Sequence, residues 1–240
     1  IRVEPIRATI ERKERFKIMT KKFYYLTLDT ETAGTQDEPI VYDLGGCVHD
    51  RHGNIVERFS FVITEVFSDK NLMATAYYYD KIPMYLKGMN KEWYPVHWYE
   101  ARKYIFNLLD KYSIKYVCAY NARFDYKALN NTMKYITHGK HKYYFHYNQV
   151  VWLDTMKAVN QVIATQKKYG KYCVNNGYMT NHKNPRPQVK AEVVYRYLIG
   201  DNAFIESHTA LSDSEIETFI LSECFRKHKK MDIRLYKNEC

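Results

Sequence analysis

Strand-like alternation of apolar and polar residues dominates the chain from residue 23 to residue 63. Residues 23–29, within "FYYLTLDTETAG", predict a first strand, and "PIVYDLGGCV" and "IVERFSFVI" predict two more. The last two runs are joined by "HDRHGN", in which Gly53 and Asn54 suit the special backbone angles of a hairpin turn. The pattern therefore predicts three antiparallel strands in meander order.

Apolar residues at helical spacing follow these strands. "HWYEARKYIFNLLDKYS" leads into the short apolar run "KYVCAY", an order typical of an α/β crossover. A helix over "NARFDYKALNNTMKYI", a strand over "QVVWLD" and a helix over "TMKAVNQVIATQ" come next. Residues 166–190 are polar and contain two Gly and two Pro residues, which predicts an irregular insertion. "AEVVYRYLI" and "SDSEIETFILSECFRKHKK" then predict two helices.

Length and composition favour one soluble domain. The 240 residues suffice for a single core over residues 23–240, preceded by a basic arm or helix over residues 1–22. No apolar run approaches the roughly 20 residues of a membrane span, and the first residues lack the apolar core of a signal peptide. We therefore expect a cytoplasmic protein with no membrane partner.

The five cysteines are odd in number, widely spaced and without a CxxC pair. They indicate neither a disulfide framework nor a zinc site. Cys173 and His182 lie in the same polar stretch, but two ligands are too few for zinc. All five suit a reducing cytoplasm, and Cys47 and Cys118 are expected in the core.

Positive charge is concentrated in one part of the chain. The net charge is +10, and residues 126–191 contain eleven Lys or Arg residues against one acid, Asp154. A surface of one sign attracts polyanions. Aromatic and His residues interleave with the charge in "KYITHGKHKYYFHYNQ", which suits stacking on unpaired bases. We interpret the segment 126–191 as binding nucleic acid, with a basic insertion around residues 134–190. The alternative is compositional, because an A- and T-rich genome also encodes much Tyr, Lys and Asn.

Two acids, Asp29 and Glu31, stand at the end of the first predicted strand. Side chains alternate across a strand, so both carboxylates and Thr27 lie on one face, opposite Leu26 and Leu28. Like charges this close raise each other's proton affinity unless a cation, usually a divalent one, lies between them. The pair therefore predicts a metal site, and an ordinary polar strand end is the alternative.

A third acid, Asp125, follows the predicted strand "KYVCAY" and lies about one helical turn beyond Asn121. Open α/β folds place their sites at this carboxyl end of the sheet. An acid in the first turn of a helix also complements the helix dipole, which is the alternative interpretation.

The fourth acid, Asp213, lies within Ser212–Glu215, which has the S-x-x-E form of a capping box. The box would start the helix at its own first residue and leave His208 in the preceding loop. A loop His with a pKa of roughly 6.5 suits a general base, and an exposed loop residue is the alternative. Glu206 and Asp201 are expected to be surface acids.

The stretches "LDTET", "NARFD" and "HTALSD" together resemble the Exo I, Exo II and Exo III motifs of the DEDDh 3′ to 5′ exonucleases, the DnaQ-like group. Their order and internal spacing match, although the chain between the second and third motifs is longer and more basic than in minimal members. The resemblance covers residues 23–226. It implies an RNase H-like fold, with a central mixed sheet of five strands, the first three antiparallel, flanked by helices.

The resemblance also implies roles for the motif residues. Asp29 would bridge two divalent ions, Mg²⁺ or Mn²⁺. Glu31 and Asp213 would hold the ion that activates water, and Asp125 would support the second ion. His208 would take the proton of that water. Four further residues would contact the terminal nucleotide: Thr30, Thr32, Asn121 and Phe124.

These roles imply a metal-dependent exonuclease that hydrolyses phosphodiester bonds at single-stranded 3′ ends and releases nucleoside 5′-monophosphates. The pattern "YCVNNGYMTN…AEVVYRYL" is similar to bacteriophage-encoded members. We therefore favour DNA over RNA as substrate, the host cytoplasm as location and a polymerase or replication protein as partner, and a homodimer stays open. The alternative is a catalytically silent nucleic-acid-binding or protein-interaction module on the same fold.

Overall fold

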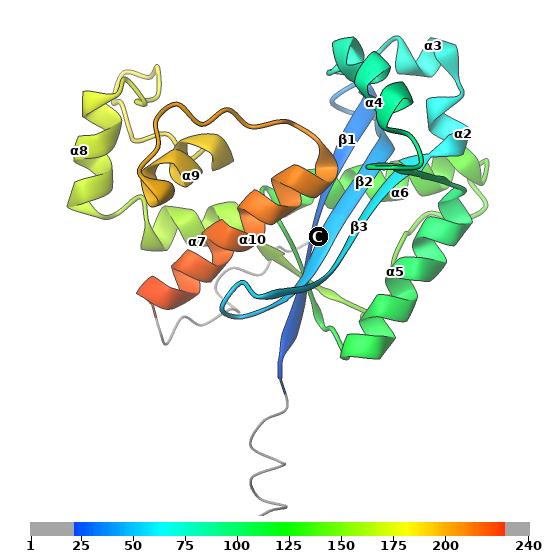
Figure 1. Ribbon diagram of the computed structural model, residues 1–240, viewed down its shortest axis with the longest axis horizontal. Helices are drawn as coiled ribbons and strands as arrows, with labels where there is room; N and C mark the ends of the chain where they lie inside the picture. Colours follow the sequence, from blue (N-terminus) through cyan, green and yellow to red (C-terminus); the bar gives the residue numbers. More distant parts are fainter. Residues whose placement is uncertain (1–21, 229–240) are drawn as a thin grey trace, which may run out of the picture.

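The computed structural model describes residues 22–228. The predicted arm over residues 1–22 lies outside the described residues except for Lys22, and so does Cys240. A sheet of six strands runs through the described part, and helices cover both of its faces (Figure 1). This arrangement confirms the predicted α/β class.

The three predicted meander strands form the antiparallel part of the sheet. They are β1 (Tyr24–Gly34), β2 (Pro39–Asp50) and β3 (Ile55–Ile63), with β2 paired to both neighbours. The next predicted strand, β5 (Tyr116–Ala119), pairs with β1 in parallel, and β6 (Val151–Asp154) pairs with β5 in the same direction. Because β1, β5 and β6 are parallel, their carboxyl ends meet at one edge of the sheet.

A further strand, β4 (Tyr94–Val96), pairs in parallel with the end of β3, so the predicted count of five strands was wrong. The order across the sheet is β4-β3-β2-β1-β5-β6. Three residues are too few for a visible alternation, and the central Pro95 argues against a strand in sequence alone. Proline is tolerated here because β4 lies at the edge of the sheet.

Short helices follow β3, and longer ones alternate with the later strands. None of the helices within residues 22–228 is long and apolar enough to cross a membrane. The helical elements in chain order are α2 (Thr64–Phe67), α3 (Lys70–Met73), η1 (Tyr79–Lys81), α4 (Ile82–Gly88), α5 (Trp98–Tyr112), α6 (Ala122–Ile136), α7 (Thr155–Val162), α8 (Lys167–Asn175), α9 (Ala191–Ile199) and α10 (Ala210–Lys227).

The sheet separates two apolar clusters, one on each face. Leu26 and Leu28 of β1 belong to the cluster that α5 and α6 cover. Tyr25 of β1 and Cys118 of β5 belong to the cluster of α7, α8, α9 and α10. In Figure 1, α10 crosses one side of the sheet, and α8 and α9 extend to the end of the molecule opposite α5. The alternation of side chains along β1 therefore decides which of its residues face α10.

The predicted irregular insertion at residues 166–190 is partly helical, because it contains α8. Tyr169 and Cys173 lie four residues apart, so both face the same cluster and are buried there. The ring of Tyr169 also packs against that of Tyr197 in α9. Two apolar anchors among Lys and Gly residues were too weak a periodic signal, and the packing partner appears only in the folded chain.

The start of α10 also differs from the prediction. The helix begins at Ala210, so the predicted capping box did not form. Instead, the backbone N–H of Ala210 donates to Oδ2 of Asp43 in β2, at 3.0 Å. The same oxygen accepts from the hydroxyl of Tyr85, at 2.7 Å. A buried carboxylate distant in sequence therefore anchors the helix end, which no local pattern could indicate.

Gly45 of β2 lets α10 approach the sheet closely. A Cβ atom at this position would lie 2.1 Å from the backbone nitrogen of Leu211. Gly45 pairs with Asp29 across the β1–β2 ladder. The glycine thus brings the first turn of α10 over the strand that carries the first predicted acid.

Candidate active site

Two elements that are far apart in the sequence bring three acids together. Carboxylate oxygens of Asp29 and Glu31 in β1 and of Asp213 in α10 all lie within 4.8 Å of one another. The strand supplies two of them because residues two apart share a face. The helix supplies the third because Asp213 lies in its first turn. The structure therefore assembles three of the four predicted metal ligands at one point.

The fourth predicted ligand, Asp125, lies in the first turn of α6 and is buried. Its Oδ1 accepts a hydrogen bond from the hydroxyl of Thr30, at 2.9 Å. Burial raises the pKa of Asp125 to about 7, although the Thr30 hydroxyl opposes the shift. Its charge in turn raises the pKa of Asp29, so the two acids share one electrostatic environment.

Asp29, Glu31 and Asp213, which we call the acid cluster, hold protons far more tightly than ordinary carboxylates do. Burial raises the pKa of Asp29 well above its ordinary value, and repulsion from Glu217 and Asp125 adds to the shift. Burial and the nearby Asp213 raise the pKa of Glu31 to about 9. Burial also raises the pKa of Asp213 to about 8. Crowded carboxylate oxygens of this kind are the ligands that Mg²⁺ and Mn²⁺ prefer, so the residues fit divalent cations.

His208 lies in the loop before α10, as the sequence predicted, and has a left-handed backbone with φ of 51°. Its Nδ1 is 3.7 Å from Oδ2 of Asp213. The ring stacks on Tyr78, with centroids 4.8 Å apart and planes 12° apart. Burial and the nearby Lys81 lower the pKa of His208 below its ordinary value. The imidazole is therefore neutral at pH 7, as a proton acceptor must be.

Lys81 in η1 forms hydrogen bonds to the backbone of the loop that carries His208. Its Nζ donates to the carbonyl oxygens of Ser207, at 2.6 Å, and His208, at 3.1 Å. The ammonium also lies over the ring of Tyr78, 4.0 Å from its centroid. Its charge lowers the pKa of Glu31 and thereby offsets part of the repulsion in the cluster. The left-handed loop is thus held in place by contacts from a distant helix.

Glu206 and Asp201 were both predicted to be surface acids, and the prediction is confirmed for Asp201 and wrong for Glu206. Asp201 is exposed, as expected of a surface acid. The Glu206 side chain, in contrast, is only 10% exposed and lies 3.6 Å from Nδ1 of His208. Burial and the nearby Glu192 raise the pKa of Glu206 to about 7. With His208 and Asp213 it forms a second group of possible metal ligands.

Sequence reasoning missed Glu217, which lies one turn beyond Asp213 on α10. It is buried, and its Oε2 accepts the backbone N–H of Tyr120, at 3.1 Å. Burial and the charges of Asp125 and Asp213 raise the pKa of Glu217 well above its ordinary value. The four-residue spacing from Asp213 was a usable signal, because it places both acids on one helix face.

The four residues predicted to contact a terminal nucleotide have different environments. Thr30 is buried, and its hydroxyl is engaged by Asp125. Thr32 and Phe124 are partly exposed, whereas Asn121 is exposed and has a left-handed φ of 63° just before α6. All four remain predictions as nucleotide contacts.

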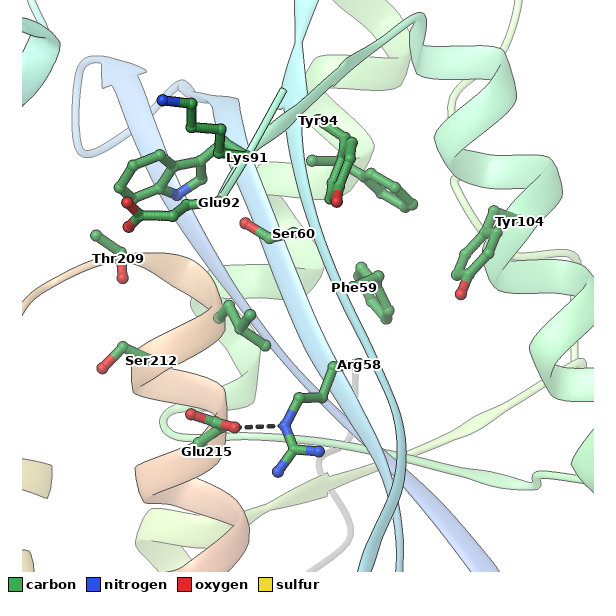
Figure 2. A pocket seen from close by; sticks show the side chains of 13 residues that line it. Arg58, Phe59, Ser60, Lys91, Glu92, Tyr94, Tyr104, Thr209, Ser212 and Glu215 are labelled. Carbon is green, nitrogen blue, oxygen red and sulfur yellow. Dashed lines mark hydrogen bonds and ion pairs between the residues drawn. The ribbon is translucent and has the colours of Figure 1, made fainter. Parts of the chain in front are cut away.

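A cavity of about 550 Å³ lies beside the acid cluster, between β3 and the first turns of α10. Figure 2 shows Arg58 of β3 and Glu215 of α10 facing each other across it, joined by an ion pair of 2.6 Å. Thr209, next to His208, lines this cavity, but none of the clustered acids does. The cavity is therefore a neighbour of the candidate site and does not contain its chemistry.

Solved structures with a similar fold are exonucleases. E. coli exonuclease I in complex with a dA16 oligonucleotide shares 13% identity with this chain, and the match covers 90% of this chain and 42% of that chain with a TM-score of 0.53. Exonuclease I from Methylocaldum szegediense shares 13% identity, covers 87% and 41% of the two chains, and has a TM-score of 0.51. The fold is RNase H-like.

This RNase H-like chain spans less than half the length of the exonuclease I chains that it matches. At such low identity the likeness establishes the shared fold. No protein-family model and no curated protein sequence matches the chain. The chemistry must therefore be inferred from the acid cluster itself.

Proposed function

We propose that this protein is a metal-dependent 3′ to 5′ exonuclease that hydrolyses phosphodiester bonds at single-stranded nucleic-acid ends. The observation that carries the proposal is the convergence of Asp29, Glu31 and Asp213 within 4.8 Å, beside a loop histidine. Buried like charges cost stability, so a fold retains them where they bind a cation or perform chemistry. The RNase H-like fold, shared with exonuclease I structures, supports the same proposal.

Two Mg²⁺ or Mn²⁺ ions fit the donor set. Asp29, Glu31 and Asp213 would hold one ion, and Asp29 with Asp125 would hold the second. When bound, such ions lower the pKa of water and stabilise the charge of the attacking and leaving oxygens. Repulsion from Glu217 raises the pKa of Asp29, so Glu217 adds negative charge to this environment.

His208 would accept the proton of the attacking water. Its lowered pKa keeps the ring neutral, and stacking on Tyr78 limits the rotation of the imidazole. Asp213 lies close enough to stabilise the imidazolium once the proton has moved. Lys81 holds the backbone of the loop, so the base is positioned before substrate binds.

The finer features of the proposal concern substrate and setting. We favour DNA over RNA, a bacteriophage origin and work beside a polymerase or replication protein in the host cytoplasm. A single exonuclease domain over residues 23–240 belongs to the same proposal, and the oligomeric state stays open. Thr32, Asn121 and Phe124 would shape the site for the terminal nucleotide, with nucleoside 5′-monophosphates as products.

The test is degradation of 5′-labelled single-stranded DNA and RNA oligonucleotides with Mg²⁺, Mn²⁺ or EDTA. We expect metal-dependent shortening from the 3′ end that disappears in Asp29→Ala and slows about 10²-fold in His208→Ala. Asp201→Asn is the matched control, because it removes an exposed acid outside the cluster. Intact oligonucleotides under every metal condition, with binding retained, would instead identify a catalytically silent binding module.

A further inference from the structure

Two groups of basic residues within the 126–191 segment lie apart on the fold. One set lies on α6 and the loop at residues 137–150, next to α5. The other set, including Lys167 and Lys168, lies on α8, at the opposite end of the molecule from α5 (Figure 1). The first surface combines positive charge with exposed aromatic rings and two cavities, so it is the stronger candidate for a ligand.

The loop at residues 137–150 and α5 form a groove of about 600 Å³, which we call the aromatic groove. Three tyrosine rings in it are largely exposed, at 71% for Tyr99, 63% for Tyr143 and 94% for Tyr147. Five cationic or titratable basic side chains share the lining: Arg102, Lys140, His141, Lys142 and His146. Exposed rings clustered with positive charge are typical of a binding surface.

Buried neighbours anchor the loop that carries two of these exposed rings, Tyr143 and Tyr147. Tyr144 and Phe145 are buried between the exposed Tyr143 and Tyr147. The backbone N–H of Tyr144 donates to Oδ1 of Asn130 in α6, at 2.8 Å, and its carbonyl accepts from Nε of Arg102, at 2.6 Å. The backbone of the loop is therefore anchored at Tyr144, between the two exposed tyrosines.

The groove has one acid in its lining, Glu65. Its carboxylate accepts the backbone N–H of Trp98, at 3.1 and 3.2 Å, and lies 3.4 Å from Nδ1 of His97. Glu65 therefore serves the first turn of α5, and the remaining charge of the groove is positive. A polyanion with flat rings matches this combination better than an apolar peptide or an acidic protein surface does.

A basic stripe runs along α6, the helix whose first turn also carries Asp125. Arg123, Lys127 and Lys134 follow one another at spacings of four and seven residues, so they lie along one side of α6. The stripe is about 16 Å long, from the 1.5 Å rise per residue. Arg123 lies in the first turn of α6, as Asp125 does, but on another side of the helix, because residues two apart do not face each other. All three stripe residues line a second cavity of about 520 Å³, whose lining shares Tyr143 with the aromatic groove.

We propose that a single-stranded nucleic acid runs from the acid cluster along the exposed side of α6 into the aromatic groove. Its bases stack on Tyr143 and Tyr147, and its phosphates contact Lys140 and Lys142. The placement of the 3′ end at the acid cluster rests on the proposed exonuclease function. The groove as a binding site for the strand does not depend on catalysis.

The test measures binding of 5′-fluorescein-labelled oligo-dT to the full chain in EDTA, by fluorescence anisotropy. Oligonucleotides of about 3 and about 20 nucleotides separate contacts near the cluster from contacts in the groove. We expect the wild type to bind the long strand more tightly than the short one. Tyr143→Ala/Tyr147→Ala should weaken binding of the long strand about tenfold or more, since each stacked base contributes substantially.

Charge is tested separately. Lys140→Ala/Lys142→Ala should reduce the slope of log affinity against log salt concentration by about 1.4, from roughly 0.7 per phosphate contact on a single strand. Lys167→Ala/Lys168→Ala on α8 is the matched control and should leave this slope as in the wild type. Repeating the series with oligo-U shows whether the groove prefers DNA or RNA.

Equal binding of the long strand by the wild type and the tyrosine variant would overturn the proposal. Equal losses in the groove lysine variant and the α8 control would also overturn it, since they would indicate a diffuse basic surface. Hydrolysis of the short oligonucleotide with Mg²⁺ by the wild type tests the exonuclease independently. Groove-dependent binding without hydrolysis would therefore retain this inference and reject the proposed function, and the opposite result would do the reverse.

Discussion

The acid cluster and the aromatic groove are opposites in almost every physical respect. The cluster is negative and mostly buried, and regular secondary structure supplies Asp29, Glu31 and Asp213. The groove is positive, its tyrosines are exposed, and a loop supplies Tyr143 and Tyr147. Both lie on one fold, and α6 contributes to each of them: Asp125 lies in its first turn, and Met133 and Ile136 line the groove.

The difference shows how charge is used in two ways in one molecule. In the cluster, burial and repulsion raise pKa values, so the folded chain is under electrostatic stress that a cation would relieve. In the groove, each cation stays hydrated and contributes little by itself, so binding depends on many weak contacts and on salt. Changes in the cluster should therefore have large and local effects, and changes in the groove should have small and additive ones.

The largest expected effect comes from Asp29→Asn, which keeps the shape of the side chain and removes its charge. Hydrolysis should fall by about 10³-fold or more, because the residue faces every other acid of the cluster. Binding of a long oligonucleotide in EDTA should persist, because the groove is untouched. A gel assay measures the loss of hydrolysis, and fluorescence anisotropy measures the retained binding. Loss of binding together with activity would mean that the two regions are not separable.

His208→Ala should lower the rate of hydrolysis by about 10²-fold, the contribution typical of a general base. The lowered pKa of His208 places the rise of the wild-type rate with pH below pH 6.5, because the base must be unprotonated. The variant should lack this rise. His182→Ala changes an exposed histidine and is the control. A variant that keeps the wild-type pH profile would exclude His208 as the base.

Gly45→Ala should disrupt the cluster while leaving the groove intact. The new methyl group would collide with the backbone of Leu211 and push the first turn of α10, with Asp213, away from β1. We expect a loss of about 2–3 kcal/mol in the free energy of unfolding, measured by urea denaturation. Gly170→Ala in α8 meets no atom within 4 Å and is the control. Equal stability of the two variants would contradict the close approach.

The stability of the metal-free protein should fall as the pH rises from 7 to 9. The pKa values of Asp125, Asp213 and Glu31 are raised to about 7, 8 and 9, so the folded chain holds protons that the unfolded chain has released. This stabilisation is complete below the ordinary carboxylate values and is lost as the pH passes through the raised ones. The slope should be about 1 kcal/mol per pH unit or more.

Thermal unfolding in EDTA and in Mg²⁺ measures this dependence. Mg²⁺ should raise the melting temperature most at pH 9, where the cluster is ionised, and least at pH 6. Manganese should act in the same direction. A melting temperature that is independent of both pH and Mg²⁺ would contradict the proposed metal site.

The smallest expected effect concerns Glu217→Gln. The amide oxygen can still accept the N–H of Tyr120, while one of the charges that raise the pKa of Asp29 disappears. The metal-free protein should therefore gain about 1 kcal/mol of stability at pH 8, measured by denaturation in EDTA. Asp201→Asn removes an exposed charge and should change nothing. Destabilisation by Glu217→Gln would show that its charge is compensated elsewhere.

Much of the fold follows from patterns that act over a few residues. Alternation predicted β1, β2 and β3, and helical spacing predicted α5, α6 and α7. The same local rules failed for β4, which is too short to show a period, and for α8, whose two anchors needed a partner helix. Periodicity shows which side chains share one face of a helix or strand. Only the packing partner shows whether that face is buried.

Some features of the candidate active site also follow from local patterns, and others depend on tertiary contacts. The shared face of Asp29 and Glu31 follows from the two-residue period of a strand, so the sequence alone determined it. The position of α10 over that face depended on the carboxylate of Asp43 and the missing side chain of Gly45, both distant in sequence. The burial of Glu206 and Glu217 and the anchoring of the aromatic groove came from tertiary contacts as well. Backbone geometry is local and can be read along the chain, whereas burial, charge repulsion and helix docking depend on contacts that exist only after the chain has folded.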